Sequence, residues 1–192
     1  GDDRAVTGAP RTRYPFWLGS LETQAADAGY LTAKALIEQA RRMPALKDTD
    51  GKLQLIALAG DRSTPSSIER TRGMQRAVDE APDVVLKQIV YADWNRNKAA
   101  EQARWLYERY PDARLVWGGS DLIAFGAMQA WRERGGKPGE NALFSGVNTS
   151  AEALRAVRDG TLSALAGGHF MGGAWGMVML YDHAKGRDFA EE

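Results

Sequence analysis

Short apolar runs alternate along this chain with segments in which apolar residues recur at helical spacing. The five apolar runs cover residues 53–59, 84–91, 113–118, 142–147 and 162–166. The segments with helical spacing cover residues 25–43, 65–80, 95–110, 121–134 and 151–158. Repeated strand–helix alternation gives right-handed crossovers and a parallel sheet that helices cover on both faces. The sequence therefore predicts an α/β fold, a three-layer α/β/α sandwich with a mostly parallel sheet.

The stretch 60–74 joins the first predicted strand, which is apolar throughout and typical of a strand buried on both faces, to the next helix. Thr64 followed by Pro65 predicts the helix start, with the Thr64 side chain accepting from a free backbone N–H. Ser66 and Glu69 offer an alternative capping box. Both interpretations begin the helix within three residues of each other.

An arginine lies on the apolar side of that helix. Arg70 precedes Met74 by four residues and Ala77 by seven, so it falls in line with the apolar stripe. The same residue is level with the carboxyl end of the preceding strand, the edge at which open α/β sheets bind ligands. Arg70 is therefore the first candidate ligand-binding residue.

Composition and motifs exclude several classes of function. The chain has 25 basic and 25 acidic residues, which gives no broad attraction to nucleic acid or anionic membranes. It contains no cysteine and no apolar run of 18 residues. The phosphate-binding glycine loops, zinc-binding HExxH and GxSxG nucleophile motifs are absent. We predict no cofactor, no metal and no nucleic-acid partner for this segment, and a protein that is not an enzyme.

Polar and aromatic side chains follow the predicted strands, where a parallel sheet collects its loops at one edge. The candidate ligand-binding residues are Arg70, Trp94, Ser120, Asn148 and His169. They offer guanidinium, indole, hydroxyl, amide and imidazole groups, which suit a neutral sugar: hydrogen bonds at the ring edge and an aromatic surface against its C–H face.

Each candidate also has a purely structural interpretation. Arg70 could pair with Glu69 or another acid, and Trp94 could pack at the base of its loop. Asn148 commonly shapes a turn, and a single histidine such as His169 is rarely a metal ligand. Asp121, next to Ser120, is interpreted first as a helix cap.

The order of four segments resembles the ribose-type periplasmic sugar-binding proteins of ABC importers, which have the type I periplasmic-binding-protein fold. The segments are IALAGDRSTPSSIERTRGMQRAV, YADWNR, VWGGSDLIAFGAMQA and FSGVNTSAEALRAVRDGTLSA. The same ligand-binding core occurs in LacI-type repressors. The similarity extends from about residue 18 to the end of the chain.

The resemblance implies roles for the candidate residues. Arg70 would bind sugar hydroxyls and Trp94 would stack on the ring. Ser120 stands where the family commonly has asparagine, Asn148 where aspartate is usual, and His169 where glutamine is common. These differences change the hydrogen-bonding groups while keeping a polar pocket with an aromatic wall.

The resemblance also implies a domain organisation. Family members close two lobes around the ligand, and this chain corresponds mainly to the second. Residues 1–20 would be a tail and an interlobe crossing segment, with a strand start or crossing at residues 14–20; residues 21–167 would be the second lobe. Residues 168–192 would be a crossing segment and a helix returning toward an absent first lobe, which makes the chain a truncated form with half a cleft.

The implied setting is the periplasm, with the signal peptide outside this sequence. The partners would be a sugar-like small molecule and the membrane permease of an ABC importer, or a membrane sensor. The apolar, glycine-containing residues 170–181 would form a dimer if no lobe covers them. Two alternatives stay open: the effector-binding domain of a LacI-type regulator, and a small α/β enzyme using Asp121 or His169.

Overall fold

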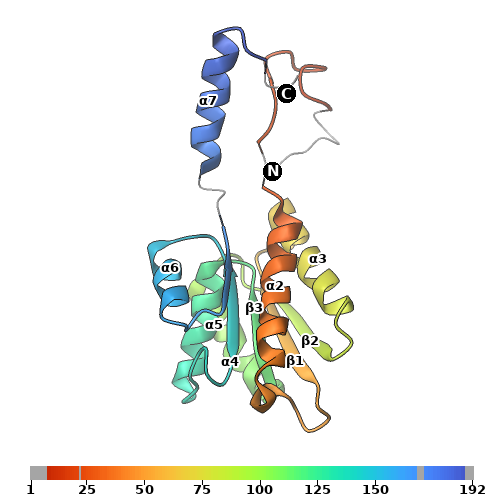
Figure 1. Cartoon of the computed structure of the whole chain (residues 1–192), viewed down its shortest axis with the longest axis vertical. Helices are drawn as coiled ribbons and strands as arrows, with labels where there is room; N and C mark the ends of the chain where they lie inside the picture. The colour runs from red at the N-terminus through yellow and green to blue at the C-terminus, as the bar shows by residue number, and fades with distance from the viewer. Residues whose placement is uncertain (1–7, 22, 168–170, 189–192) are drawn as a thin grey trace. The chain divides into compact units, whose positions relative to one another are not determined.

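The computed structural model describes residues 8–21, 23–167 and 171–188, which divide into two compact units. The sheet unit is Gln24–Gly167, and the terminal unit is Gly1–Thr23 together with Gly168–Glu192. The units are drawn in Figure 1 and are described separately below.

The sheet unit is built on one five-stranded parallel sheet in the order β2-β1-β3-β4-β5. The strands are β1 (Leu53–Ala59), β2 (Val84–Tyr91), β3 (Ala113–Gly118), β4 (Leu143–Val147) and β5 (Ala164–Ala166). All five predicted strands are confirmed, the last two shortened at their first residues. The predicted α/β fold with a parallel sheet is therefore correct.

Helices cover both faces of this sheet, as a three-layer sandwich requires (Figure 1). One face packs against α2 (Ala25–Arg41) and α3 (Pro65–Asp79). The other packs against α4 (Arg96–Arg109), α5 (Asp121–Glu133) and the short α6 (Ala151–Arg158). A 3₁₀ turn, η1 (Pro44–Leu46), follows α2, because Pro44 ends the helical pattern.

Strand β1 supplies both hydrophobic cores. Leu55 and Ala57 belong to the core under α2 and α3, whereas Ile56 and Leu58 belong to the core under α4 and α5. Side chains alternate between the two faces of a strand, so a strand covered on both faces must be apolar at every position. This explains why apolar residues in β1 follow one another instead of alternating with polar ones.

Two glycines bring helices α2 and α3 into backbone contact. A Cβ atom at Gly73 would lie 1.8 Å from the Ala26 carbonyl oxygen, and one at Gly29 would lie 1.9 Å from the Arg70 carbonyl oxygen. Beneath the pair, Trp117 Nε1 donates to Thr32 Oγ1 at 3.0 Å. This close packing fixes the position of α3, and with it the residue at the edge of the sheet, Arg70.

The capping of α3 differs from both sequence interpretations. Thr64 is the N-cap residue, but its hydroxyl donates to Asp61 instead of accepting from the helix. Glu69 pairs with Arg72, so the capping box with Ser66 does not form. The other helix starts follow the usual rule: Asn95, Ser120 and Ser150 accept from Lys98 N, Ile123 N and Ala153 N.

Among its described residues, the terminal unit contains the helix α7 (Gly172–Ala184), which lies within the predicted helix at residues 170–184. None of the α7 side chains that the structure describes is buried. Arg11 forms an ion pair with Asp188 at 2.5 Å. The possible strand start at residues 14–20 is wrong: these residues form a turn and irregular backbone, in which Trp17 N donates to Tyr14 O and Trp17 O accepts from Arg11 N.

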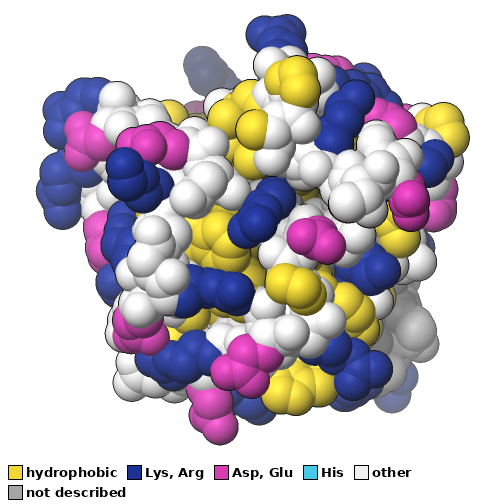
Figure 2. Space-filling model, turned by 90° about the horizontal axis from the view of Figure 1, so that it is seen from below, with side chains coloured by type: hydrophobic (Ala, Val, Ile, Leu, Met, Phe, Trp, Pro, Cys, Tyr) yellow, Lys and Arg dark blue, Asp and Glu magenta, His cyan; other side chains and the backbone are white. Residues whose placement is uncertain are grey.

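The surface of the sheet unit agrees with the balanced composition. Figure 2 views the end at which the strands begin, and basic and acidic side chains lie interspersed there among apolar patches. None of the helices in the described part of the chain combines the length and apolar character that a membrane crossing requires.

Candidate ligand-binding site

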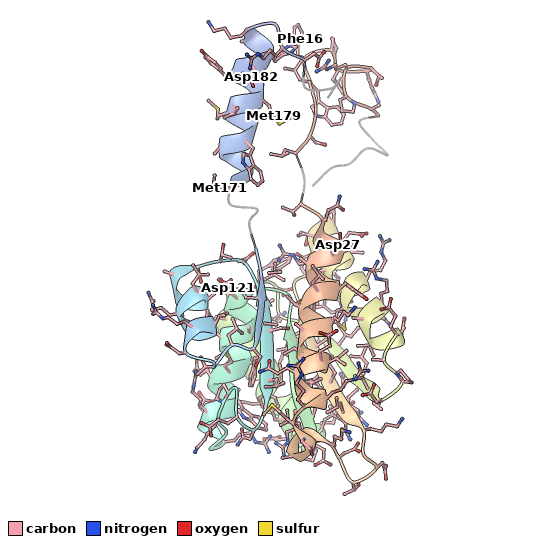
Figure 3. The ribbon with its side chains drawn as sticks, viewed as in Figure 1. Phe16, Asp27, Asp121, Met171, Met179 and Asp182 are labelled. Carbon is pink, nitrogen blue, oxygen red and sulfur yellow. The ribbon has the colours of Figure 1, made fainter. Side chains whose placement is uncertain are left out.

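Four loops meet where the strands of the sheet unit end. Backbone hydrogen bonds hold them together: Gly119 N donates to Leu58 O at 2.8 Å, and Asp93 N donates to Gly60 O at 2.9 Å. Figure 3 labels Asp121 at this edge of the sheet unit. Arg70, Trp94, Ser120 and Asn148 come from these loops or the helices they begin, and His169 lies outside the described residues.

Arg70 is the charged centre of this edge. Its side chain is nearly buried, with 8% exposure, and Nη1 donates to the Gly119 carbonyl oxygen at 2.8 Å. The buried Nε has no hydrogen-bond partner among the described residues. Burial lowers the pKa of Arg70, and the nearby charge of Asp121 partly opposes this. The ion pair with Glu69 does not form, so Arg70 keeps an unused donor.

Trp94 lies beside Arg70. The Arg70 guanidinium carbon is 5.5 Å from the centroid of the Trp94 ring, within range of a cation–π contact. The indole also lies against Gly60, where a Cβ atom would be 2.3 Å from Trp94 Cζ2. The indole Nε1 donates to Asp61 Oδ2 at 2.6 Å. The loop-packing interpretation of Trp94 is therefore confirmed, and its role as a stacking surface for a ligand stays a prediction.

Asp121 and Asn148 form a second polar pair at the same edge. Asn148 Nδ2 and Leu122 N both donate to Asp121 Oδ1, each at 2.9 Å. The other carboxylate oxygen of Asp121 has no hydrogen-bond partner in the described part of the chain, although the residue is only 3% exposed. Asn148 has φ +92°, so it also shapes its turn. The pair thus leaves one carboxylate oxygen to accept from a ligand.

Ser120 has a structural role in this arrangement. Its hydroxyl caps α5 by accepting from Ile123 N at 3.3 Å, and the residue is 2% exposed. Asp121 is the first residue of α5 rather than its cap. The interpretation of Asp121 as the helix cap is therefore wrong, while a ligand-binding role for Ser120 stays a prediction.

Asp61 is the residue that sequence reasoning missed. Its carboxylate accepts five hydrogen bonds, from Ser63 N and Oγ, Thr64 N and Oγ1, and Trp94 Nε1. The bonds from Thr64 and Ser63, with that from the Thr64 hydroxyl largest, hold the pKa of Asp61 well below its ordinary value. An aspartate followed by serine and threonine two and three residues later is typical of such a turn, so the signal for the local bonds was present.

These residues together suit a polyhydroxylated ligand. A sugar hydroxyl can accept from a guanidinium N–H and donate to a carboxylate oxygen, because a hydroxyl does both at once. In residues 8–21, 23–167 and 171–188, no three His, Cys, Asp or Glu side chains gather closely enough to hold a metal ion.

A separate hollow of about 390 Å³ lies between α4 and α5, away from this edge, and is lined by Arg104, Tyr107, Glu108, Ala130, Glu133 and Arg134. Several of its polar groups already have partners: Arg104 pairs with Glu133 at 2.7 Å, and the Tyr107 hydroxyl donates to Ala127 O at 2.9 Å. The sheet edge remains the better candidate for a polar ligand.

Comparisons with known proteins show the family of this chain. The sequence profile of the periplasmic binding protein domain matches residues 19–188. The galactofuranose-binding protein YtfQ of Escherichia coli (strain K12) is 25% identical over 123 residues, which are 62% of this chain and 39% of that protein. The D-allose-binding periplasmic protein of the same organism is 27% identical over 133 residues, 69% of this chain and 42% of that protein.

Among solved structures, a periplasmic sugar-binding protein from Pseudomonas fluorescens superposes with a TM-score of 0.82 and 46% identity, covering 88% of this chain and 51% of that one. The chain thus spans about half the length of the relatives it matches.

Proposed function

Because this chain belongs to the periplasmic binding protein domain family, we propose that it binds a sugar or sugar-like polyol and supplies it to the permease of an ABC importer. The observation that carries the proposal is Arg70, a buried guanidinium whose Nε has no partner, held beside an indole ring and a carboxylate. Burying a guanidinium without a full set of partners is costly to stability, which supports a role for Arg70 at this edge other than stabilising the fold.

The ligand class follows from the balance of charges at the edge. The single guanidinium of Arg70 lies near the carboxylate of Asp121. A second carboxylate, that of Asp61, is hydrogen-bonded to Trp94 next to it. An anionic ligand would meet these carboxylates, whereas a neutral sugar would use both donor and acceptor. The related proteins named above are described as binding galactofuranose and D-allose, both neutral sugars. The proposed role is binding without catalysis, in the periplasm.

We assign this chain one wall of the binding site. Solved relatives are about twice as long, and the candidate residues lie on an open edge of one sheet. Small ligands need most of their surface buried for tight binding. A second lobe closing over the edge would supply the remaining contacts.

The test is an NMR titration of the 192-residue chain, which detects weak binding. Neutral sugars such as D-allose, D-galactose and L-arabinose, with D-glucuronate as the anionic comparison, are added while backbone and side-chain N–H signals are followed. We expect at least one neutral sugar to shift the signals of Trp94 and Gly119 with a dissociation constant of roughly 1 mM or weaker, since one wall makes few contacts. No response to any neutral sugar contradicts the ligand class, and submicromolar binding contradicts the one-wall assignment.

Helix α7 is expected to make the isolated chain self-associate. Trp175, Met177 and Tyr181 are between half and two-thirds exposed, and none of the described α7 side chains is buried. A helix that is apolar on all sides is stable in water only when something covers it. Light scattering should therefore give the mass of a dimer at high concentration, and Met177→Glu should return it to a monomer. A monomeric parent chain at the same concentration would contradict the expectation, and Lys185→Glu, beyond the end of α7, is the control.

A further inference from the structure

We propose that Asp61 is a positioning residue, which fixes the Trp94 indole ring beside Arg70 and so sets the aromatic wall of the candidate site. The effect of Asp61 on ligand binding rests on the proposed function, whereas the hydrogen bond between Asp61 and Trp94 exists without any ligand. Asp61 and Trp94 are 33 residues apart and belong to loops after different strands. Asp61 is therefore a bridge between the loop before α3 and the loop before α4.

The geometry leaves the carboxylate little freedom. Oδ1 accepts from Ser63 N, Ser63 Oγ and Thr64 N at 2.7–2.9 Å, and Oδ2 accepts from Thr64 Oγ1 at 2.7 Å. These four bonds come from the loop to which Asp61 belongs, so they orient the carboxylate without any contribution from Trp94. The fifth bond, from Trp94 Nε1 at 2.6 Å, then ties the indole to an acceptor that is already fixed.

The backbone around the indole requires such a restraint. Asp93 has φ +49° and Trp94 has φ +58°, a left-handed conformation that is unfavourable for side-chain-bearing residues. Strained conformations of this kind persist only where surrounding contacts hold them. At Trp94 those contacts are the Asp61 hydrogen bond and the packing on Gly60, while Lys98 pairs with Asp93.

The consequence is an orientation of the ring that depends on one hydrogen bond. With Nε1 held by Asp61 and the six-membered ring lying over Gly60, the indole cannot rotate away from the guanidinium of Arg70. Without the bond, the packing on Gly60 remains but the ring is free to turn about its χ angles. Asp61 thus acts on a ligand through Trp94.

The direct test follows the Trp94 indole N–H signal, identified by its loss in Trp94→Phe. In Asp61→Asn one carboxylate oxygen becomes an NH₂ group, so the charge-assisted bond is lost; we expect a shifted indole signal and exchange with water at least about tenfold faster. The indole signals of Trp117 and Trp131, which are bonded to Thr32 and Asn141, should not move and serve as internal controls. An unchanged Trp94 signal overturns the proposal.

Two further variants separate positioning from general loop stability. Ser63→Ala removes one bond from Oδ1 and keeps the bond to Trp94, so its indole signal should stay near that of the parent. Asp48→Asn is the matched control: Asp48 accepts from Asp50 N, Lys52 N and Gln54 Nε2 in the loop that precedes β1. If Ser63→Ala or Asp48→Asn moves the Trp94 signal as far as Asp61→Asn does, the effect is one of stability and the proposal fails.

The sugar titration provides the second readout. Asp61→Asn should weaken the response to the best neutral sugar about threefold to tenfold, and Trp94→Phe combined with Asp61→Asn should weaken it no further than Trp94→Phe alone. Additive losses would mean that Asp61 acts on the ligand directly, which contradicts the proposal. If no sugar binds the parent chain, the proposed function fails while the indole measurement still decides the role of Asp61.

Discussion

Replacing Arg70 with methionine should remove sugar binding while leaving the fold intact. A hydrogen bond from a charged group contributes about 1.5–3 kcal/mol, so losing the guanidinium is expected to weaken the sugar response by about 10-fold to 100-fold. The measurement is the NMR titration with the best-binding neutral sugar. A variant that binds like the parent would remove Arg70 from the site.

The same substitution should have little effect on the stability of the fold. Arg70 is buried with Nε unpartnered and only Nη1 bonded to Gly119 O, so the folded chain carries a desolvation cost that methionine, which is of similar length, does not carry. The free energy of unfolding should change by no more than about 1 kcal/mol in either direction. A residue kept for stability would instead show a large loss.

Arg72→Met is the matched control. Arg72 is on the same helix, two residues away, but its side chain is 72% exposed and paired with Glu69. Exposed pairs contribute little, so this variant should keep both the sugar response and the melting temperature of the parent. Equal loss of binding in both variants would indicate a general effect of charge on α3.

Replacing Gly73 with alanine should cause the largest loss of stability. The new Cβ atom would lie 1.8 Å from the Ala26 carbonyl oxygen and 2.9 Å from Tyr30 N, so helices α2 and α3 must separate. Backbone cannot yield as a flexible side chain does, and we expect a loss of about 3 kcal/mol or more despite the better helix propensity of alanine. Thermal unfolding followed by circular dichroism should show a melting temperature lower by about 10 °C.

Gly176→Ala tests whether this effect belongs to the helix contact. Gly176 is also inside a helix, but no atom lies within 4 Å of the Cβ that alanine would add. Its stability should be unchanged or higher by up to about 1 kcal/mol, the intrinsic preference of alanine over glycine in a helix. If Gly73→Ala and Gly176→Ala behave alike, the α2–α3 contact is not tight in solution.

The strands and most of the helices could be predicted because their signals are local. The run of apolar residues at β1 and the helical spacing before and after it are properties of neighbouring positions, and all five strands were found. The placement of Arg70 at the edge of the sheet followed from the same counting. The possible strand at residues 14–20 failed because a short aromatic segment looks apolar whether or not a neighbouring strand pairs with it.

The roles of individual polar residues were harder to predict. Ser120 and Asp121 are adjacent, and either could cap a helix, so the sequence could not say that Ser120 caps while Asp121 binds Asn148. Thr64 could accept from the helix or donate to Asp61, and the donated bond was the one formed. Each choice depends on which partner lies within hydrogen-bond distance.

The sequence by itself therefore determined the α/β fold, the alternation of strands and helices, and the edge of the sheet at which the candidate residues lie. Only the tertiary structure decided which groups meet there: Asp61 with Trp94, Asn148 with Asp121, and Arg70 with the Gly119 carbonyl. The physical reason is the range of the two kinds of information. Hydrophobic periodicity acts over a few neighbouring residues, whereas these hydrogen bonds join loops 27 to 49 residues apart, whose distances are set by the packing of the whole sheet.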